Sequence, residues 1–325
     1  MKNLSILVAT LLITGSVHAS DPSADIGSRL VHSKSSQVHA SYKSAENRTQ
    51  FLESKGRKIA YRSIGKGKAI ILALRFRGVL DSWDPAFLDA LAKNNRVIIF
   101  DYSGIGDSTG KSATTMPQMV DDIFDLADGL KLDKFILGGW SMGGFAAQQA
   151  LVRNPGRITQ ALLIGTAPAV KEFLNPPKAF LDAGAKPIMN LEDETVLLFD
   201  PSSPMSVRAA KESYARMNSR KIDKSPVAPS AMFDNHRLAV GDYMEDKIGS
   251  VKMLKITKTP ILVIAGDKDP GSPPITWFSE SGKLPTTQII VLPQAGHGPQ
   301  QQYPELSASY IHSFLEGSAP EKSMH

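Results

Sequence analysis

Two stretches of the chain match the pattern G-x-S-x-G, in which glycines flank a serine that a sharp turn presents to solvent. One of them, residues 139–143, reads G-W-S-M-G and comes after the apolar segment 135–137. A helical pattern of small residues follows, so the serine would lie at a strand-to-helix turn, where free N–H groups of the helix start converge. We therefore predict that Ser141 is a nucleophile.

The other match, residues 106–110, has a different setting. It reads G-D-S-T-G and lies in a polar, glycine-rich loop beyond the apolar segment 96–101. Its continuation, G-K-S, is similar to a phosphate-binding loop, but Ile105 occupies a position where that motif requires glycine. We predict neither a nucleophile nor a phosphate site at Ser108.

A serine hydroxyl is a weak nucleophile until a base takes its proton. Among the seven histidines, His297 lies in the loop Q-A-G-H-G that follows the apolar segment 288–292. Loops at the carboxyl ends of parallel strands build the sites of open α/β sheets, so we predict His297 as the base. The other histidines lie in the predicted signal peptide, the leader, the predicted cap, the last helical segment and the chain end: His18, His32, His39, His236, His312 and His325.

The base needs a carboxylate that holds its imidazole in the right tautomer. The apolar segment 261–265 ends in G-D-K-D-P, which offers Asp267 and Asp269 at the same sheet edge. We predict Asp269, with Asp267 as the alternative, because one of two neighbouring turn carboxylates often only caps its loop. The order serine, aspartate, histidine differs from the orders of the chymotrypsin and subtilisin classes.

The segments that must position these residues alternate between apolar strand patterns and helical patterns. Such alternation predicts an α/β fold with a mostly parallel central sheet flanked by helices. Residues 169–257 break the rhythm with a polar, mostly helical pattern, so we predict a helical cap there. The predicted parts are a signal peptide (1–19), a flexible leader (20–48), the α/β core (49–168 and 258–317), the cap (169–257) and a flexible tail (318–325).

The first twenty residues are typical of an export signal. Lys2 supplies a positive charge, residues 4–14 are apolar, and Val17 and Ala19 fit the small-residue cleavage pattern before Ser20. The alternative is an uncleaved anchor, but the apolar run is too short to span a bilayer and no charge cluster follows it. We predict an exported protein, periplasmic or secreted, with no stable membrane anchor after cleavage.

Composition removes several classes of protein. The chain has no cysteine, which excludes disulfides, thiolate zinc sites, iron–sulfur clusters and cysteine nucleophiles. The net charge of +5 is spread along 325 residues without a basic run, so we expect no nucleic-acid partner. A serine triad needs neither metal nor cofactor, and its partner would be a small-molecule acyl substrate.

The chain resembles the α/β-hydrolase superfamily, and within it the branch of esterases and non-haem haloperoxidases. The resemblance rests on L-D-S-W-D at 80–84, F-D-Y-S-G-I-G-D-S at 100–108 and G-W-S-M-G-G at 139–144. It implies hydrolysis of carboxylic esters without a cofactor, through an acyl-enzyme on Ser141. The same triad also serves lactone, thioester or amide hydrolysis, perhydrolysis and carbon–carbon cleavage, and a slow-turnover binding protein is a further alternative.

One segment departs from the pattern of this family. Its members usually carry His-Gly and then an oxyanion-hole residue after the third strand, whereas residues 74–76 read L-R-F. Alignment on Trp83 implies that the backbone N–H groups of Phe76 and Met142 form the oxyanion hole.

Two side chains beside these donors are candidates for substrate contacts, Arg75 and Trp140. For Arg75, as for the nearby Arg77, two interpretations stay open. In one, the arginine pairs with a carboxylate such as Asp107 or faces solvent. In the other, it draws an acidic substrate to the site.

Overall fold

The computed structural model describes residues 41–318. The predicted signal peptide, most of the predicted leader and nearly all of the predicted tail lie outside these residues. The leader prediction extends to residue 48, whereas residues 43–46 form the short helix α2 (Lys43–Glu46). The Ser44 hydroxyl in α2 is buried and donates to the Pro85 carbonyl at 3.1 Å, so the folded part begins earlier than predicted.

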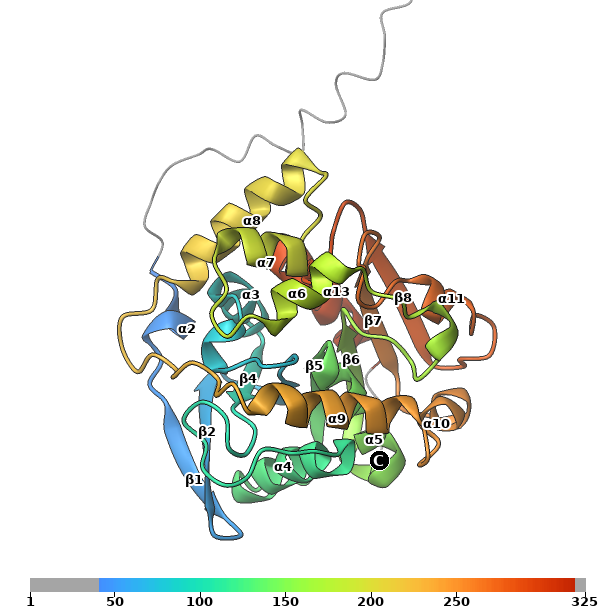
Figure 1. Ribbon diagram of the computed structural model, residues 1–325. Coiled ribbons are helices and arrows are strands. Elements are labelled where there is room, and N and C mark those ends of the chain that lie inside the picture. The colour runs from blue at the N-terminus through green and yellow to red at the C-terminus, as the bar shows by residue number, and fades with distance from the viewer. Residues whose placement is uncertain (1–40, 319–325) are drawn as a thin grey trace, which may run out of the picture. The chain divides into compact units, whose positions relative to one another are not determined.

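Within residues 41–318, eight strands form one sheet in the order β1-β2-β4-β3-β5-β6-β7-β8 (Figure 1). The pairs β1–β2 and β2–β4 are antiparallel, and all pairs from β4 to β8 along the sheet are parallel, as the alternating pattern predicted. The strands are β1 (Gln50–Ser54), β2 (Arg57–Ile64), β3 (Lys68–Ala73), β4 (Asn95–Phe100), β5 (Phe135–Trp140), β6 (Ile158–Ile164), β7 (Ile261–Gly266) and β8 (Thr287–Leu292).

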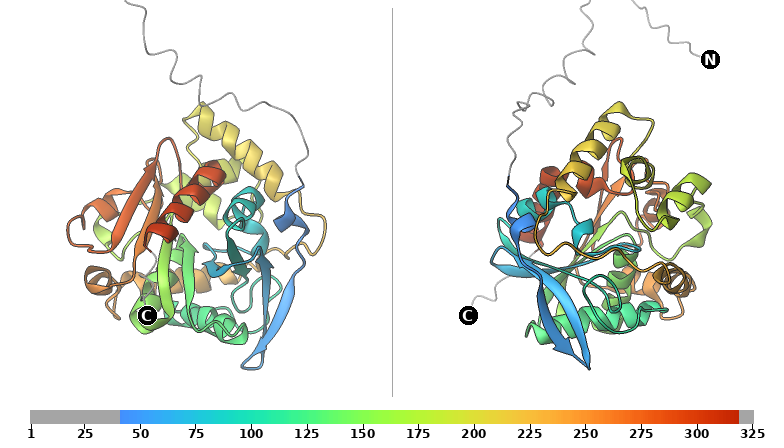
Figure 2. Two further views of the ribbon diagram at one scale, coloured as in Figure 1. Left: turned by 180° about the vertical axis from the view of Figure 1, so that it is seen from behind. Right: turned by 60° about the vertical axis from the view of Figure 1, so that its left-hand side comes forward.

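Helices cover both faces of the sheet, which explains why the central strands read as continuous apolar runs. Helices α3 (Pro85–Leu91) and α13 (Pro304–Gly317) pack together on one face, and α4 (Met116–Gly129) and α5 (Met142–Arg153) pack together on the other (Figures 1 and 2). Shorter helical elements lie in the connections: η2 (Leu80–Ser82), η3 (Pro155–Arg157), η4 (Lys171–Phe173), α11 (Ile275–Phe278) and α12 (Pro299–Gln302).

A run of helices separates β6 from β7. They are α6 (Lys178–Ala185), α7 (Leu191–Leu198), α8 (Pro204–Met217), α9 (Met232–Met244) and α10 (Ser250–Ile256). This run falls within the segment predicted as a cap, and we call helices α6 to α9 the cap helices. Among residues 41–318, no helix combines the length and apolar character needed to cross a bilayer.

The cap helices are attached to both helical layers of the core. On one side, Arg216 of α8 forms a buried ion pair with Asp84 at 2.8 Å, and Asp84 also caps the start of α3. On the other side, Tyr243 of α9 stacks on Phe145 of α5, with 4.3 Å between ring centroids. The cap helices therefore extend across the carboxyl ends of the parallel strands.

Candidate active site

Ser141 lies on the turn between β5 and α5, in a backbone conformation that few residues adopt. Its φ of 56° and ψ of −119° place it in a strained region, which glycine neighbours make possible. A Cβ atom on Gly143 would lie 2.2 Å from the carbonyl oxygen of Ala73. The turn is tied to the sheet because the Ser141 N–H donates to the Ile164 carbonyl at 2.9 Å.

The structure brings Ser141, His297 and Asp269 together from three separate strand ends. His297 Nε2 lies 2.7 Å from Ser141 Oγ, and His297 Nδ1 lies 2.9 Å from each carboxylate oxygen of Asp269. An Nδ1 proton directed at the carboxylate leaves Nε2 free to accept the serine proton. This arrangement can generate a serine alkoxide and hold the resulting imidazolium beside a negative charge.

The two aspartates of the loop after β7 have different surroundings. Asp269 is 3% exposed, and its Oδ1 also accepts the N–H groups of Gly271 and Ser272 at 2.8 Å. Asp267 is exposed and accepts the Ala295 N–H at 3.2 Å, so it braces the loop that carries His297. The structure therefore places Asp269, and not the alternative Asp267, against the imidazole.

Trp140 does not lie where a substrate contact requires it, which corrects the sequence prediction. Its side chain is 0% exposed, and its indole N–H donates to the His297 carbonyl at 2.8 Å. The ring also packs against Trp83, with 5.6 Å between centroids. Trp140 thus supports the loop that carries His297 from the buried side of that loop.

The predicted oxyanion donors lie on the two segments that meet at Ser141. Met142 begins α5, and Phe76 lies in the loop after β3. Within residues 41–318, neither backbone N–H donates a hydrogen bond to another group of the chain. Both N–H groups are thus free to donate to a developing negative charge, which is one condition for an oxyanion hole.

The loop that carries Phe76 is held by a cap residue that sequence reasoning did not select. His236 of α9 accepts the Arg77 N–H at its Nδ1, at 3.1 Å, and Arg77 itself has a positive φ of 54°. The ring of His236 also contacts the ring of Phe76 edge-on, with 5.5 Å between centroids. No local motif marks His236, because its partners are about 160 residues away in the chain.

His236 is buried, and its charge state suits this role. Burial, with a smaller effect from the Arg77 guanidinium, lowers the pKa of His236 to about 3. The imidazole is therefore neutral at physiological pH and keeps a lone pair for the Arg77 N–H. The Arg77 guanidinium adds a second attachment by donating to the carbonyls of Ala185 and Lys186, at 2.8 and 3.0 Å.

Arg75 neither pairs with Asp107 nor faces solvent, so the first interpretation of this residue is wrong. Its side chain lies with the guanidinium carbon 5.4 Å from the centre of the Trp140 ring, and Nη1 donates to the Phe76 carbonyl at 2.9 Å. Burial lowers its pKa to about 10, an effect that the charge of Glu194 opposes. Arg75 therefore remains charged at neutral pH.

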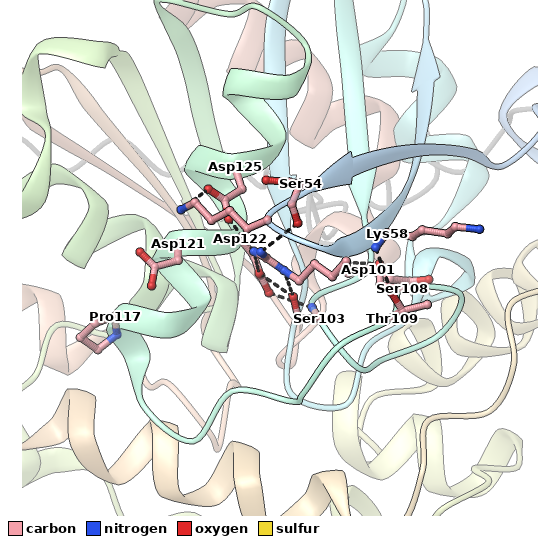
Figure 3. Close-up of polar contacts among 12 residues, drawn as sticks. Ser54, Lys58, Asp101, Ser103, Ser108, Thr109, Pro117, Asp121, Asp122 and Asp125 are labelled. Atoms are coloured by element: carbon pink, nitrogen blue, oxygen red, sulfur yellow. Dashed lines mark hydrogen bonds and ion pairs between the residues drawn. The ribbon is translucent and has the colours of Figure 1, made fainter.

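Ser108, in the other G-x-S-x-G match, has a role inside the loop after β4. Its hydroxyl donates to the Asp101 carbonyl at 2.7 Å and accepts the Ala60 N–H at 2.8 Å. Figure 3 shows Ser108 beside Asp101 and Thr109 in this loop. The hydroxyl is thus committed to backbone groups, in agreement with the prediction that Ser108 is not a nucleophile.

No group of three or more histidine, aspartate or glutamate side chains within residues 41–318 is arranged to hold a metal ion.

Known proteins share both the sequence pattern and the fold. The family profile described as alpha/beta hydrolase fold matches residues 76–302. Proline iminopeptidase PfmaB of Pestalotiopsis fici is 27% identical over 282 residues, which cover 82% of this chain and 99% of that protein. BpoC of Mycobacterium tuberculosis, whose name describes a non-heme bromoperoxidase, is 25% identical over 245 residues, covering 74% of this chain and 90% of BpoC.

A solved structure is similar over the same region. It is an alpha/beta hydrolase fold protein from Chitinophaga pinensis, with a TM-score of 0.74 and 27% identity. The similarity covers 84% of this chain and 98% of that one. The family profile and the solved structure agree on the fold, while the names of the two sequence relatives describe different reactions.

Proposed function

The chain belongs to the α/β-hydrolase family, and on that basis we propose that it is a serine hydrolase that cleaves carboxylic esters through an acyl-enzyme on Ser141. The observation that carries the proposal is the unbroken line of short contacts from Asp269 through His297 to Ser141 Oγ. Nothing in the packing of the sheet requires these three polar side chains at three separate strand ends.

The reaction follows from the positions of the protons. His297 Nε2 takes the Ser141 proton as Oγ bonds to the ester carbonyl carbon, and the carbonyl electron pair moves to oxygen. The N–H groups of Phe76 and Met142 stabilise that oxyanion. When the electron pair returns, the ester C–O bond breaks and the alcohol takes the proton from His297. Water then repeats the sequence on the acyl-enzyme and releases the acid.

An ester makes a smaller demand on this site than an amide. An alcohol leaves once His297 has delivered a single proton, whereas an amine is a poorer leaving group. Amide hydrolysis is the second candidate, favoured by the name of the relative PfmaB, a proline iminopeptidase.

The first experiment is labelling with a fluorophosphonate, which reacts with activated serines, together with a panel of short-chain esters. We expect labelling and ester hydrolysis to be lost in Ser141→Ala and retained in the matched variant Ser108→Ala. Labelling that persists in Ser141→Ala would contradict the assignment. A folded protein that is neither labelled nor active would instead indicate a ligand-binding protein without turnover.

We also propose that the protein is exported after cleavage behind Ala19. The support is the charge, apolar run and small-residue pattern of residues 1–19.

A further inference from the structure

A pocket of about 300 Å³ lies between the loop after β3 and the cap segments, and five cationic side chains line it. The cations are Arg75, Arg77, Lys186, Arg220 and Lys224. The pocket also contains two acidic side chains, Asp81 and Glu194, so positive charge predominates.

Most of these charges already have partners within the described chain. Asp81 accepts a hydrogen bond from Arg62 at 2.6 Å and forms an ion pair with Arg220 at 3.1 Å, so two cations share this carboxylate. Lys186 pairs with Asp193, and Arg77 donates to backbone carbonyls. The charge of the pocket therefore depends most on the remaining cations, Arg75 and Lys224.

Arg75 is the buried cation with unused hydrogen-bonding capacity. Its side chain is only 8% exposed, and its Nε–H has no partner within residues 41–318. Glu194 is the nearby acid, but no ion pair joins the two, and burial raises the pKa of Glu194 to about 7 despite the opposing effect of Arg75. At neutral pH the guanidinium thus has only a partly ionised neighbour. A buried charge without a full counter-charge is unfavourable, and an anion in the pocket would remove that penalty.

Two sets of contacts connect the lining of the pocket to the catalytic residues. Arg75 directly precedes Phe76, bonds to its carbonyl, and lies over the ring of Trp140, the residue before Ser141. Helix α6 gives the second set, because Phe180 packs edge-on against the His297 ring at 5.4 Å, and Gly184 of the same helix lines the pocket. Phe180 and Gly184 are four residues, about one helical turn, apart in α6, so one helix contacts both the catalytic imidazole and the pocket.

We propose that this pocket binds a carboxylate of the substrate, so that the preferred substrates are esters whose acyl chain ends in a second, free carboxylate. The inference rests on the proposed function, because it names the substrate class of the same site. The planar fork of Arg75 matches the two oxygens of a carboxylate, and Lys224 at the exposed side adds long-range attraction. A neutral acyl chain would leave the Arg75 charge without this partner.

The test compares pairs of 4-nitrophenyl esters that differ only in charge. One member of each pair has a straight neutral acyl chain, and the other is the half-ester of a dicarboxylic acid with the same number of carbons. We expect higher kcat/KM for the half-esters at one or two chain lengths, an advantage that shrinks at high ionic strength. Equal kcat/KM within every pair would overturn the proposal, while hydrolysis of the neutral esters would leave the proposed function standing.

Three variants assign that preference to the pocket. Arg75→Met keeps the length and apolar contacts of the side chain, and we expect it to reduce the ratio of half-ester to neutral kcat/KM by roughly ten- to a hundred-fold. Lys224→Ala, at an exposed position, should reduce the ratio by a smaller factor without disturbing the fold. The matched control is Arg153→Met, because Arg153 is a partly exposed arginine of α5 paired with Asp121, and its ratio should equal that of the wild type.

A binding measurement tests the pocket without relying on catalytic turnover. Ser141→Ala retains the pocket, and we expect calorimetry to detect binding of the half-ester to it, with much weaker binding to the double variant Ser141→Ala/Arg75→Met. If the half-ester does not bind to folded Ser141→Ala, or binds equally to both, the pocket is not a carboxylate site. In that case Arg75 serves the internal packing of the loop after β3, next to Glu194 of α7.

Discussion

At the scale of single residues, the site shows how two chemically equal neighbours acquire different roles. Asp267 and Asp269 lie two positions apart in one loop, yet only Asp269 is buried against the imidazole of His297. The hydrogen bonds from Gly271 and Ser272 fix its carboxylate in place. An ionised carboxylate at this position can hold the Nδ1 proton of His297 throughout the reaction.

A pair of isosteric variants tests this assignment. We expect Asp269→Asn to lower kcat by about 10⁴-fold, because an amide no longer enforces the tautomer that leaves Nε2 free. Asp267→Asn should leave kcat nearly unchanged, since its side-chain oxygen can still accept the Ala295 N–H. Steady-state kinetics on one ester, with circular dichroism to establish folding, measures both. A larger loss in Asp267→Asn than in Asp269→Asn would reverse the roles.

At the scale of elements, the cap helices do more than cover the sheet. Helix α9 supplies His236, which accepts the N–H of Arg77, and the carbonyls at the end of α6 accept the guanidinium of the same residue. Arg77 lies in the loop after β3, and the same loop carries Phe76, one of the two proposed oxyanion donors. The position of the cap helices is therefore coupled to the geometry of the oxyanion hole.

His236 is thus a positioning residue, and its removal should affect turnover more than substrate binding. We expect His236→Ala to lower kcat by up to about 10²-fold with a smaller change in KM, because a displaced oxyanion donor weakens transition-state stabilisation. His236→Asn places an acceptor oxygen near the position of Nδ1 and should recover most of the activity. Equal losses in both variants would indicate that His236 only fills space.

His236 should also affect how the stability of the protein depends on pH. The folded-state pKa of about 3 lies below the ordinary value of 6.5, so the unfolded chain binds the extra proton first. The free energy of unfolding should therefore fall as pH decreases from about 6.5, by about 3 kcal/mol at pH 4 from this group alone. Urea unfolding at pH 7 and pH 4 should show a smaller decrease for His236→Asn than for the wild type.

At the scale of the whole molecule, the described fold begins at α2, well after the cleavage site predicted behind Ala19. Cleavage there leaves every strand and helix of residues 41–318 intact. We therefore expect the protein from the exported fraction to have an N-terminus at Ser20, as read by intact-mass spectrometry. A chain in that fraction that still begins at Met1 would contradict the cleavage, and retention in the cytoplasm would contradict the export.

The sequence by itself determined the features that neighbouring residues encode. The alternation of apolar and helical segments predicted the parallel α/β sheet, since burial on both faces demands continuous apolar strands. The glycines around Ser141 predicted its turn, because side chains at those positions would collide with backbone. The loop after the last strand singled out His297 for the same local reason, its place at a strand end.

Only the tertiary structure decided the features that depend on contacts between distant segments. It selected Asp269 over Asp267, buried Trp140 beneath the histidine loop, and brought His236 of the cap against Arg77. It also placed Arg75 in a cationic pocket instead of beside Asp107. No spacing along the chain encodes these contacts, because each depends on how the cap helices and the strand-end loops pack together in three dimensions.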